Sequence, residues 1–244
     1  MAAAIRTFDV IGVGSMGAAA CYHLARRDVR VLGLERFDLP HGMGSYHSQS
    51  RMIRQAYFEH PDYVPRLRHS YVLWDELSAE LGRDVIHVTG GLMTGPAGAA
   101  VVEGSLRSVR EHALPHDLLE AAEAMRRFPQ FVIPEDYRVL HDHRAGLVLP
   151  ERAVAGHAVR RMLRDHMPHA DGPLLSIHVC MYTNCPDHHF IIERHPHYRN
   201  VFLACDFSGH GFKFATVIGG TLAELATAGR SSLSIKFLGL GRFN

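Results

Sequence analysis

Three glycines near the N-terminus constrain the fold more than any other feature of the sequence. They are Gly12, Gly14 and Gly17. An apolar, β-branched run over residues 8–13 leads into them, and its length suits a buried strand. The residues AAACYHLARR that follow are typical of a helix, and a second apolar run over residues 29–34 ends in Glu35. Strand, glycine turn, helix, strand and acidic residue therefore occur in the order of a dinucleotide-binding βαβ unit.

Each part of this unit has a physical role. Gly12 permits the tight turn, Gly14 lets the backbone approach a pyrophosphate, and Gly17 lets the helix pack closely on the strand. The N-terminus of the helix offers N–H groups and a partial positive charge to phosphates. Glu35 can accept hydrogen bonds from ribose hydroxyls and disfavours the additional phosphate of NADP. On this unit alone, FAD and NAD are both compatible ligands.

Composition excludes several classes of protein. The 26 Lys and Arg residues nearly balance the 25 Asp and Glu residues, so no overall field attracts nucleic acid or an anionic membrane. The sequence has no run of eighteen apolar residues that could span a bilayer. Its four cysteines do not suggest the disulfide framework of a secreted protein. We expect a cytoplasmic protein with reduced thiols, one that binds neither nucleic acid nor membranes.

The rest of the chain alternates between helical and strand patterns. A long loop rich in Gly, Ser, His and Arg leads to Arg51 and Arg54, which would share a face if they lay on a helix. Further helices are predicted over residues 63–81, 100–113, 118–129, 151–165 and from about 212 to a stop at Gly229, and strands over residues 87–94, 138–143, 146–150 and 200–205.

Two of these helices have a stripe of residues predicted to be buried. In the helix over residues 63–81 the stripe is Leu67, Tyr71, Trp74 and Leu77. In the last helix it is Phe214, Val217, Ile218, Thr221, Leu222 and Leu225. Lys213, one of only two lysines, is placed in the first turn of that last helix, where a cation opposes the helix dipole. This placement suggests that an anion lies nearby.

The stretch CMYTNCPDHHF contains two cysteines and two adjacent histidines. Cys180, Cys185, His188 and His189 could supply four zinc-compatible ligands. Adjacent histidines on a strand point to opposite faces, however, and C-x₄-C-x₂-H-H is not a common zinc spacing. There are two alternatives to a zinc site: a small-loop disulfide between the two cysteines, or attachment of another group to a cysteine.

The ordered motifs resemble one family, the flavoprotein amine oxidases that include monomeric sarcosine oxidase and N-methyltryptophan oxidase. The resemblance rests on VIGVGSMGAAACYHLARR, LPHGMGSYHSQSRMIRQAY, CMYTNCPDHHFIIERHP and FSGHGFKFATVIGG, with weaker similarity at VTGGLMTG and GLVLPERA. These four motifs follow the family's order, and together with the two weaker stretches they extend over most of the chain. The resemblance implies FAD, bound covalently through the Cys180 thiolate, which is the nucleophilic form of cysteine, and it leaves Cys185 with a structural role.

The resemblance also implies the site residues. The cofactor-binding residues would be Gly12, Gly14, Ser15, Met16, Gly17, Glu35, Arg36, Ser45, Arg51, Cys180, Gly209, His210, Gly211 and Lys213. The catalytic residues would be Arg51, Arg54, Tyr182 and Lys213, and no metal is implied. Arg54 and Lys213 correspond to the pair that holds the substrate carboxylate, Arg51 would lie closer to the flavin, and Tyr182 would line the substrate cavity.

The implied fold class is α/β. It consists of a Rossmann-like FAD-binding domain, with a mixed sheet and flanking helices, and a reduced remnant of a substrate domain. The FAD-binding domain is predicted over residues 1–85 and 141–244, and the partial substrate domain over residues 86–140. The implied reaction oxidises sarcosine or another N-methyl or secondary amino acid to an imine, which hydrolyses to an aldehyde and an amine while O₂ becomes H₂O₂.

The chain departs from the family in its centre. The segment that would hold most of the substrate-domain sheet, an O₂-activating lysine and a histidine beside the substrate is missing, and Lys236 does not match that lysine. Missing strands would leave open sheet edges and apolar faces, which an oligomer could cover. Two alternatives follow: a truncated flavin-binding protein without efficient oxidase activity, and an NAD-dependent dehydrogenase.

Overall fold

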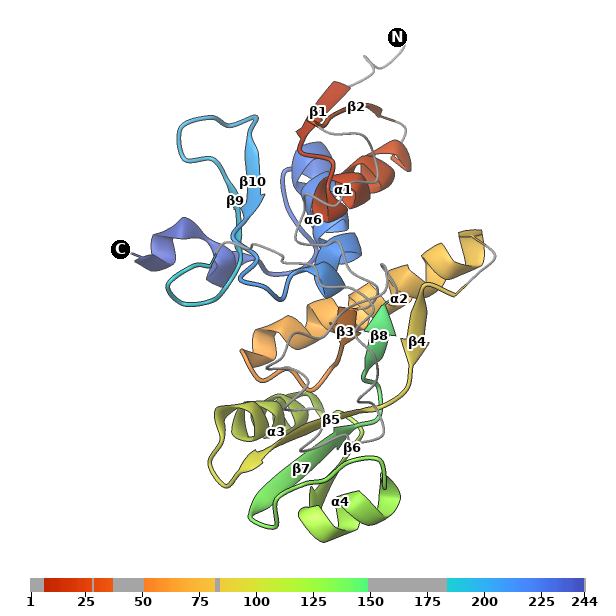
Figure 1. Cartoon of the computed structure of the whole chain (residues 1–244). Coiled ribbons are helices and arrows are strands. Elements are labelled where there is room, and N and C mark those ends of the chain that lie inside the picture. Colours follow the sequence, from red (N-terminus) through yellow and green to blue (C-terminus); the bar gives the residue numbers. More distant parts are fainter. Residues whose placement is uncertain (1–6, 28, 37–50, 82–83, 149–183, 244) are drawn as a thin grey trace. The chain divides into compact units, whose positions relative to one another are not determined.

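A computed structural model describes residues 7–27, 29–36, 51–81, 84–148 and 184–243. The chain forms two compact units: unit 1 comprises Met1–His47, His69–Trp74 and Cys180–Asn244, and unit 2 comprises Ser48–Arg68 and Asp75–Val179 (Figure 1). Unit 1 contains β1 (Thr7–Ile11), α1 (Ser15–Ala25), β2 (Arg30–Leu34), β9 (Ile191–Arg194), β10 (Phe202–Cys205), α6 (Ala215–Ala228) and the 3₁₀ helices η3 (Phe212–Phe214), η4 (Lys236–Leu238) and η5 (Leu240–Phe243). Helix α2 (Val64–Leu81) contributes its middle turns to unit 1.

Unit 2 contains two three-stranded sheets. Its elements are β3 (Arg51–Ile53), the 3₁₀ helix η1 (Pro61–Tyr63), β4 (Ile86–Val88), β5 (Gly91–Pro96), α3 (Ala100–His112), β6 (His116–Glu120), α4 (Ala121–Arg127), β7 (Tyr137–Asp142) and β8 (Gly146–Val148). The strand orders are β3-β8-β4 and β5-β7-β6, and all of these pairs are antiparallel.

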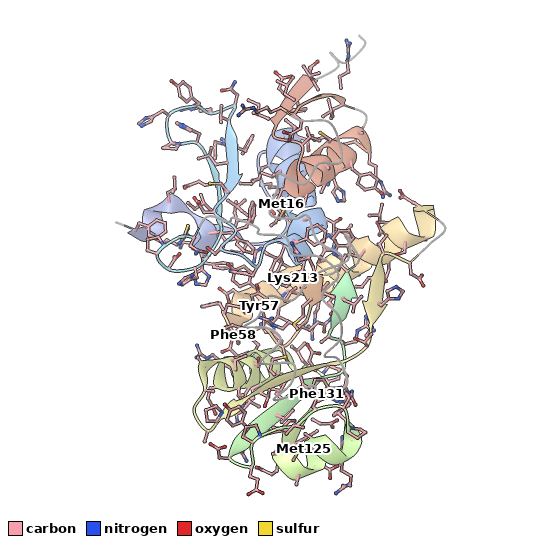
Figure 2. All side chains as sticks on the ribbon, in the orientation of Figure 1. Met16, Tyr57, Phe58, Met125, Phe131 and Lys213 are labelled. Atoms are coloured by element: carbon pink, nitrogen blue, oxygen red, sulfur yellow. The ribbon has the colours of Figure 1, made fainter. Side chains whose placement is uncertain are left out.

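The sheet β5-β7-β6, which has the longer strands and is called the larger sheet of unit 2, is covered on both faces. Leu140 of β7 belongs to a buried cluster with α3, whereas its neighbour Val139 belongs to a second cluster with α4. Met125 and Phe131 pack against this second cluster (Figure 2). Successive strand residues point to opposite faces, so the alternation of β7 supplies both cores.

Unit 1 begins with the βαβ unit that the glycine spacing predicts. Strands β1 and β2 are parallel and in register, with Val10 opposite Gly33. Gly33 faces α1, because a β-carbon there would lie 3.0 Å from a methyl group of Val13 and 3.4 Å from the sulfur of Cys21. The α/β architecture with a Rossmann-like nucleotide-binding unit is therefore confirmed.

Helix α6 lies directly against α1 (Figure 1). Gly219 makes this approach possible, since a β-carbon there would be 2.6 Å from the β-carbon of Ala19. His23 of α1 reaches across to α6, and its Nε2 lies 3.1 Å from the hydroxyl of Thr216. Burial, followed by the charges of Arg27 and Arg26, lowers the pKa of His23 to about 4. Burial and the two arginines, rather than the contact with Thr216, therefore favour the neutral imidazole.

The buried position of His23 predicts that the packing of α1 on α6 is weakened by acid. Because the pKa of His23 is about 4 in the folded chain and 6.5 for an ordinary histidine, the unfolded chain takes up the proton first as the pH falls. Its contribution to stability is full above pH 6.5 and is lost between pH 6.5 and 4. We therefore expect the free energy of unfolding to fall by about 1 kcal/mol more in the wild-type chain than in His23→Gln when the pH is lowered from 7.5 to 5.5. This figure is discounted for solvent screening.

Urea unfolding of both proteins at the two pH values measures this difference. His197→Gln, which removes an exposed imidazole of the same unit, is the matched control and should behave as the wild type. Identical pH dependence in all three proteins would contradict the assignment.

The side of β1 and β2 that faces away from α1 is exposed and carries three large apolar side chains. Ile11, Leu32 and Leu34 are 85%, 51% and 46% exposed. Among the described residues, these two strands pair only with each other. Covering of this face by a second subunit remains a prediction. No helix in the described ranges is both long and apolar enough to cross a membrane.

Most predicted elements are observed, and four details differ. The predicted strand over residues 87–94 is interrupted at Gly90, whose φ is +75°, to give β4 and β5. The start of the predicted helix 118–129 is strand β6, because it pairs with β7. Arg51 lies on strand β3 rather than on a helix shared with Arg54. Lys213 lies in η3, just before α6. The predicted helix 151–165 lies outside the described residues.

Candidate active site

The glycine turn of unit 1 has the geometry of a phosphate cradle. Gly12 adopts a left-handed φ of +86°, and its N–H donates to the carbonyl of Leu34 over 2.8 Å. A β-carbon on Gly17 would overlap the carbonyl oxygen of Gly12 and lie 3.3 Å from Val10 Cγ1. Gly14 is the N-cap of α1, and the N-terminus of this helix receives no side-chain cap. A helix end of this kind suits the phosphates of a dinucleotide. Ser15 and Met16 form the first turn of α1 (Figure 2).

Glu35 lies at the carboxyl end of β2, beside the glycine turn. Its Oε2 accepts a hydrogen bond from the backbone N–H of Val13 over 2.8 Å, and its Oε1 accepts one from the N–H of Arg36 over 2.7 Å. The carboxylate is thus fixed between the end of β2 and the turn. This is the position from which an acidic residue binds ribose hydroxyls.

The turn before α6 holds a rare backbone conformation. Asp206, Ser208 and Gly209 have φ of 53°, 47° and 74°. Two contacts fix this turn: Ser208 Oγ accepts from the N–H of Cys185 over 3.2 Å, and His210 Nε2 lies 2.8 Å from the carbonyl oxygen of His188. Non-glycine residues at positive φ cost about 1–3 kcal/mol each and cluster at functional sites.

Close packing fixes the end of the same turn. A β-carbon on Gly211 would lie 2.8 Å from the ring of Phe207. The predicted cofactor residues Gly209, His210 and Gly211 therefore share unit 1 with the glycine turn.

Lys213 follows this turn and is only 6% exposed (Figure 2). Its Nζ donates to the carbonyl of His210 over 2.8 Å. Its own backbone carbonyl accepts from Ser70 Oγ over 2.6 Å and from Trp74 Nε1 over 3.3 Å, and Phe212 stacks on the Trp74 ring. A buried ammonium held in this way gives unit 1 a fixed positive charge next to the strained turn.

Arg54 is the corresponding fixed cation of unit 2. Its side chain is 12% exposed, and its Nη2 lies 2.9 Å from both carboxylate oxygens of Glu59. The guanidinium carbon lies 4.9 Å from the ring centres of both Tyr57 and Phe58, within cation–π range. Its Nε is buried and has no hydrogen-bond partner among the described residues. A buried donor without a partner is uncommon in proteins and calls for a structural or functional explanation.

The loop after Arg54 is clamped from two sides. Asp142 is 1% exposed, and its Oδ2 accepts the backbone N–H groups of Gln55 and Ala56 over 2.7 and 2.8 Å. On the other side, Ser105 of α3 donates to the carbonyl of Ala56 over 3.1 Å, and Ser108 donates to that of Tyr57. These bonds fix the backbone that carries Arg54.

Tyr57 and Cys185 are buried groups beside the predicted site residues. Burial, and then the charge of Glu59, raise the pKa of the Tyr57 phenol well above its usual value, so it stays neutral. Burial also raises the pKa of the Cys185 thiol, and Cys185 is a free cysteine. Among the described residues, His188 and His189 do not gather with Cys185 into a set of metal donors.

The structure groups some predicted site residues and separates others. The glycine turn with Ser15 and Met16, Glu35, Arg36, the turn residues 209–211 and Lys213 belong to unit 1, and Arg51 and Arg54 belong to unit 2. Ser45, Cys180 and Tyr182 lie outside the described residues. Glu59 and Asp142 were not identified from the sequence. The only signal for Glu59 was an acidic residue five positions after Arg54.

The comparisons with known proteins agree with this geometry. The model of the family described as "FAD dependent oxidoreductase" matches residues 10–159 and 157–225. The chain belongs to this family of FAD-dependent oxidoreductases. The glycine turn, Glu35 and the turn before α6 of this oxidoreductase therefore belong to a flavin-binding fold.

Individual relatives extend the comparison. Monomeric sarcosine oxidase from Streptomyces avermitilis is 30% identical over 365 residues, covering 93% of this chain and 95% of the relative. N-methyl-L-tryptophan oxidase from Yersinia pestis is 32% identical over 145 residues, 59% of this chain and 39% of the relative. The crystal structure of L-proline dehydrogenase from P. horikoshii has a TM-score of 0.81 at 16% identity, covering 98% and 97% of the two chains, and shows the same fold.

The alignment with the Streptomyces protein also measures the missing segment. It spans 365 positions, whereas this oxidoreductase has 244 residues. At least 121 aligned positions, the difference of these two lengths, therefore have no counterpart in the chain. The two matches to the family model meet at residues 157–159, which places the discontinuity in the segment before Cys180.

Proposed function

We propose that this oxidoreductase oxidises sarcosine or another small N-methyl or secondary amino acid, with FAD attached through Cys180. Arg54 carries the proposal: a buried guanidinium with an unused Nε donor is suited to a substrate carboxylate. The proposal also draws support from the 30% identity to a monomeric sarcosine oxidase.

The residues present fit FAD. Gly17 has no room for a β-carbon, so α1 packs closely on the glycine turn, and the N-terminus of α1, which has no side-chain cap, offers N–H groups to a pyrophosphate. Ser15, Met16, Glu35, Arg36 and Ser45 would hold the nucleotide end, and the turn at residues 209–211 would hold the ring. When bound, FAD would supply a two-electron acceptor: the substrate C–H bond would lose a hydride and the amine N–H a proton, and these two electrons and two protons would leave with O₂ as H₂O₂.

The chain itself would orient the substrate. Arg54 and Lys213 would bind the carboxylate, Tyr182 would line the cavity, and Arg51 would add positive charge beside the ring. The imine product would then hydrolyse to an aldehyde and an amine. These roles rely on fixed charges, which stabilise developing charge without reorganisation.

A second candidate function is a flavin-binding protein that turns over poorly. It is favoured by the 121 or more missing positions and by the exposed face of β1 and β2. Cys21, Cys185 and Cys205 are free thiols, which supports a reducing compartment such as the cytoplasm.

Removing Cys180 tests the flavin linkage. Acid precipitation of the wild-type protein should leave a yellow pellet, because a thioether survives denaturation. Cys180→Ala should release all of its flavin into the supernatant, and Cys185→Ala, the matched control, should retain the yellow pellet. A colourless wild-type pellet, or a yellow Cys180→Ala pellet, would refute attachment at Cys180.

Turnover separates the two candidate functions. The oxidase is expected to release H₂O₂ with sarcosine and to lose its yellow colour when sarcosine is added without oxygen. Flavin that stays yellow with every N-methyl amino acid tested would establish the binding protein instead.

A further inference from the structure

Three donor side chains converge on one face of the larger sheet of unit 2. They are Asp117 of β6, His141 of β7 and His143, which follows β7. His143 Nε2 lies 3.0 Å and His141 Nδ1 lies 3.4 Å from Asp117 Oδ2, and all three donor atoms lie within 4.8 Å of one another. This group belongs to neither the glycine turn nor the Arg54 loop.

The sheet register produces this convergence. Asp117 and His141 are directly opposite in the antiparallel β6–β7 pair, so their side chains share a face. His143, two positions further, returns to that face, whereas the intervening Asp142 points into the opposite core. The edge of the Phe128 ring packs on His141, with the ring centres 5.0 Å apart, and limits the orientations of that imidazole.

The donor set fits a divalent transition metal. Zinc binds imidazole nitrogen and carboxylate oxygen at about 2.0–2.2 Å, which places donors of a tetrahedral site roughly 3.3 Å apart. The two distances to Asp117 Oδ2, 3.0 and 3.4 Å, bracket this value. We propose that Asp117, His141 and His143 form a zinc-class metal site, with water in the fourth position.

Arg127 would compete with a bound metal for the Asp117 carboxylate. Its Nη1 lies 3.0 Å from Asp117 Oδ2, and its Nε donates to Glu123 over 2.7 Å. A bound metal would displace the guanidinium from Asp117, and Arg127 would keep its second partner, Glu123. Arg127 therefore weakens the site without closing it.

The site has a structural consequence for unit 2. The metal would join β6 to the residues on both sides of Asp142, whose carboxylate holds the Gln55 and Ala56 backbone. Metal binding should therefore raise the thermal unfolding temperature of the chain, because a ligand that binds only the folded state stabilises it.

The experiment titrates Zn²⁺ into the full, flavin-loaded chain by calorimetry after chelation. One equivalent should bind in the wild type. In Asp117→Asn and in His143→Gln, the affinity of that site should fall at least about a hundredfold, since each variant removes one of three ligands. The Asp117 and His143 side chains are 35% and 41% exposed, so we expect both variants to fold.

Two further variants make the test specific. His197→Gln is the control. It removes an imidazole whose ring centre lies 5.9 Å from that of His195, and this histidine pair is not part of a metal-donor cluster among the described residues. The variant should bind zinc as the wild type does. Arg127→Gln removes the competing cation and should tighten binding by about two- to fivefold. Zinc binding that persists in both ligand variants, or that does not tighten in Arg127→Gln, overturns the proposal. Calorimetry of zinc is independent of the proposed amine oxidation.

Discussion

Gly17→Ala is expected to abolish flavin binding and to lower the free energy of unfolding by about 3 kcal/mol. The added β-carbon would overlap the carbonyl oxygen of Gly12, a backbone atom that cannot rotate away. The carbonyl carbon of Gly12, at 2.9 Å, and Val10 Cγ1, at 3.3 Å, block the remaining space. The helix must then move from the strand, and the phosphate cradle opens.

Gly12→Ala is the matched control for this prediction. Among the described residues, no atom of the surrounding structure lies within 4 Å of a β-carbon built on Gly12, but the φ of +86° is unfavourable for alanine. We expect a cost of about 1–2 kcal/mol and weaker but measurable flavin binding. Urea unfolding and the flavin content per chain measure both effects. Equal losses in the two variants would show that backbone conformation, rather than overlap at Gly17, controls the cradle.

The features that the sequence predicts well are local ones. The βαβ unit follows from glycines at fixed spacing between two apolar runs, and both strands and α1 are observed. Phe214, Val217 and Ile218 are buried as predicted, although they belong to a continuous buried run over residues 213–219, and the left-handed Gly229 ends α6. In these segments, neighbouring residues alone determine the outcome.

The features that the sequence did not predict depend on distant partners. Residues 118–120 have helical propensity but form β6, because β7 offers backbone hydrogen bonds to them. The same pairing places Asp117 beside His141, which no spacing within either segment indicates. Likewise, Asp142 was one acidic residue in a strand pattern, and its role appears only when the Gln55 and Ala56 backbone lies against it.

Arg54 is the second residue whose removal should have a large effect. Under the proposed function, its guanidinium neutralises the substrate carboxylate in a buried setting, where a charge-assisted hydrogen bond is strong. Arg54→Gln should therefore lower kcat/KM for sarcosine by about 100- to 1000-fold, equivalent to about 3–4 kcal/mol. Arg54→Lys should restore only part of this, because an ammonium lacks the planar donor geometry.

The chemistry of the substrate separates binding from structural damage. For a methylated amine without a carboxylate, such as dimethylamine, the wild type and Arg54→Gln should have similar kcat/KM. Arg68→Gln, which removes a cation that donates to the His112 carbonyl elsewhere in unit 2, should leave both substrates unaffected. If Arg54→Gln instead lowered kcat/KM equally for both substrates, Arg54 would act by anchoring Glu59 and the ring of Tyr57. A loss confined to the carboxylate-bearing substrate is the result expected if this guanidinium binds the carboxylate.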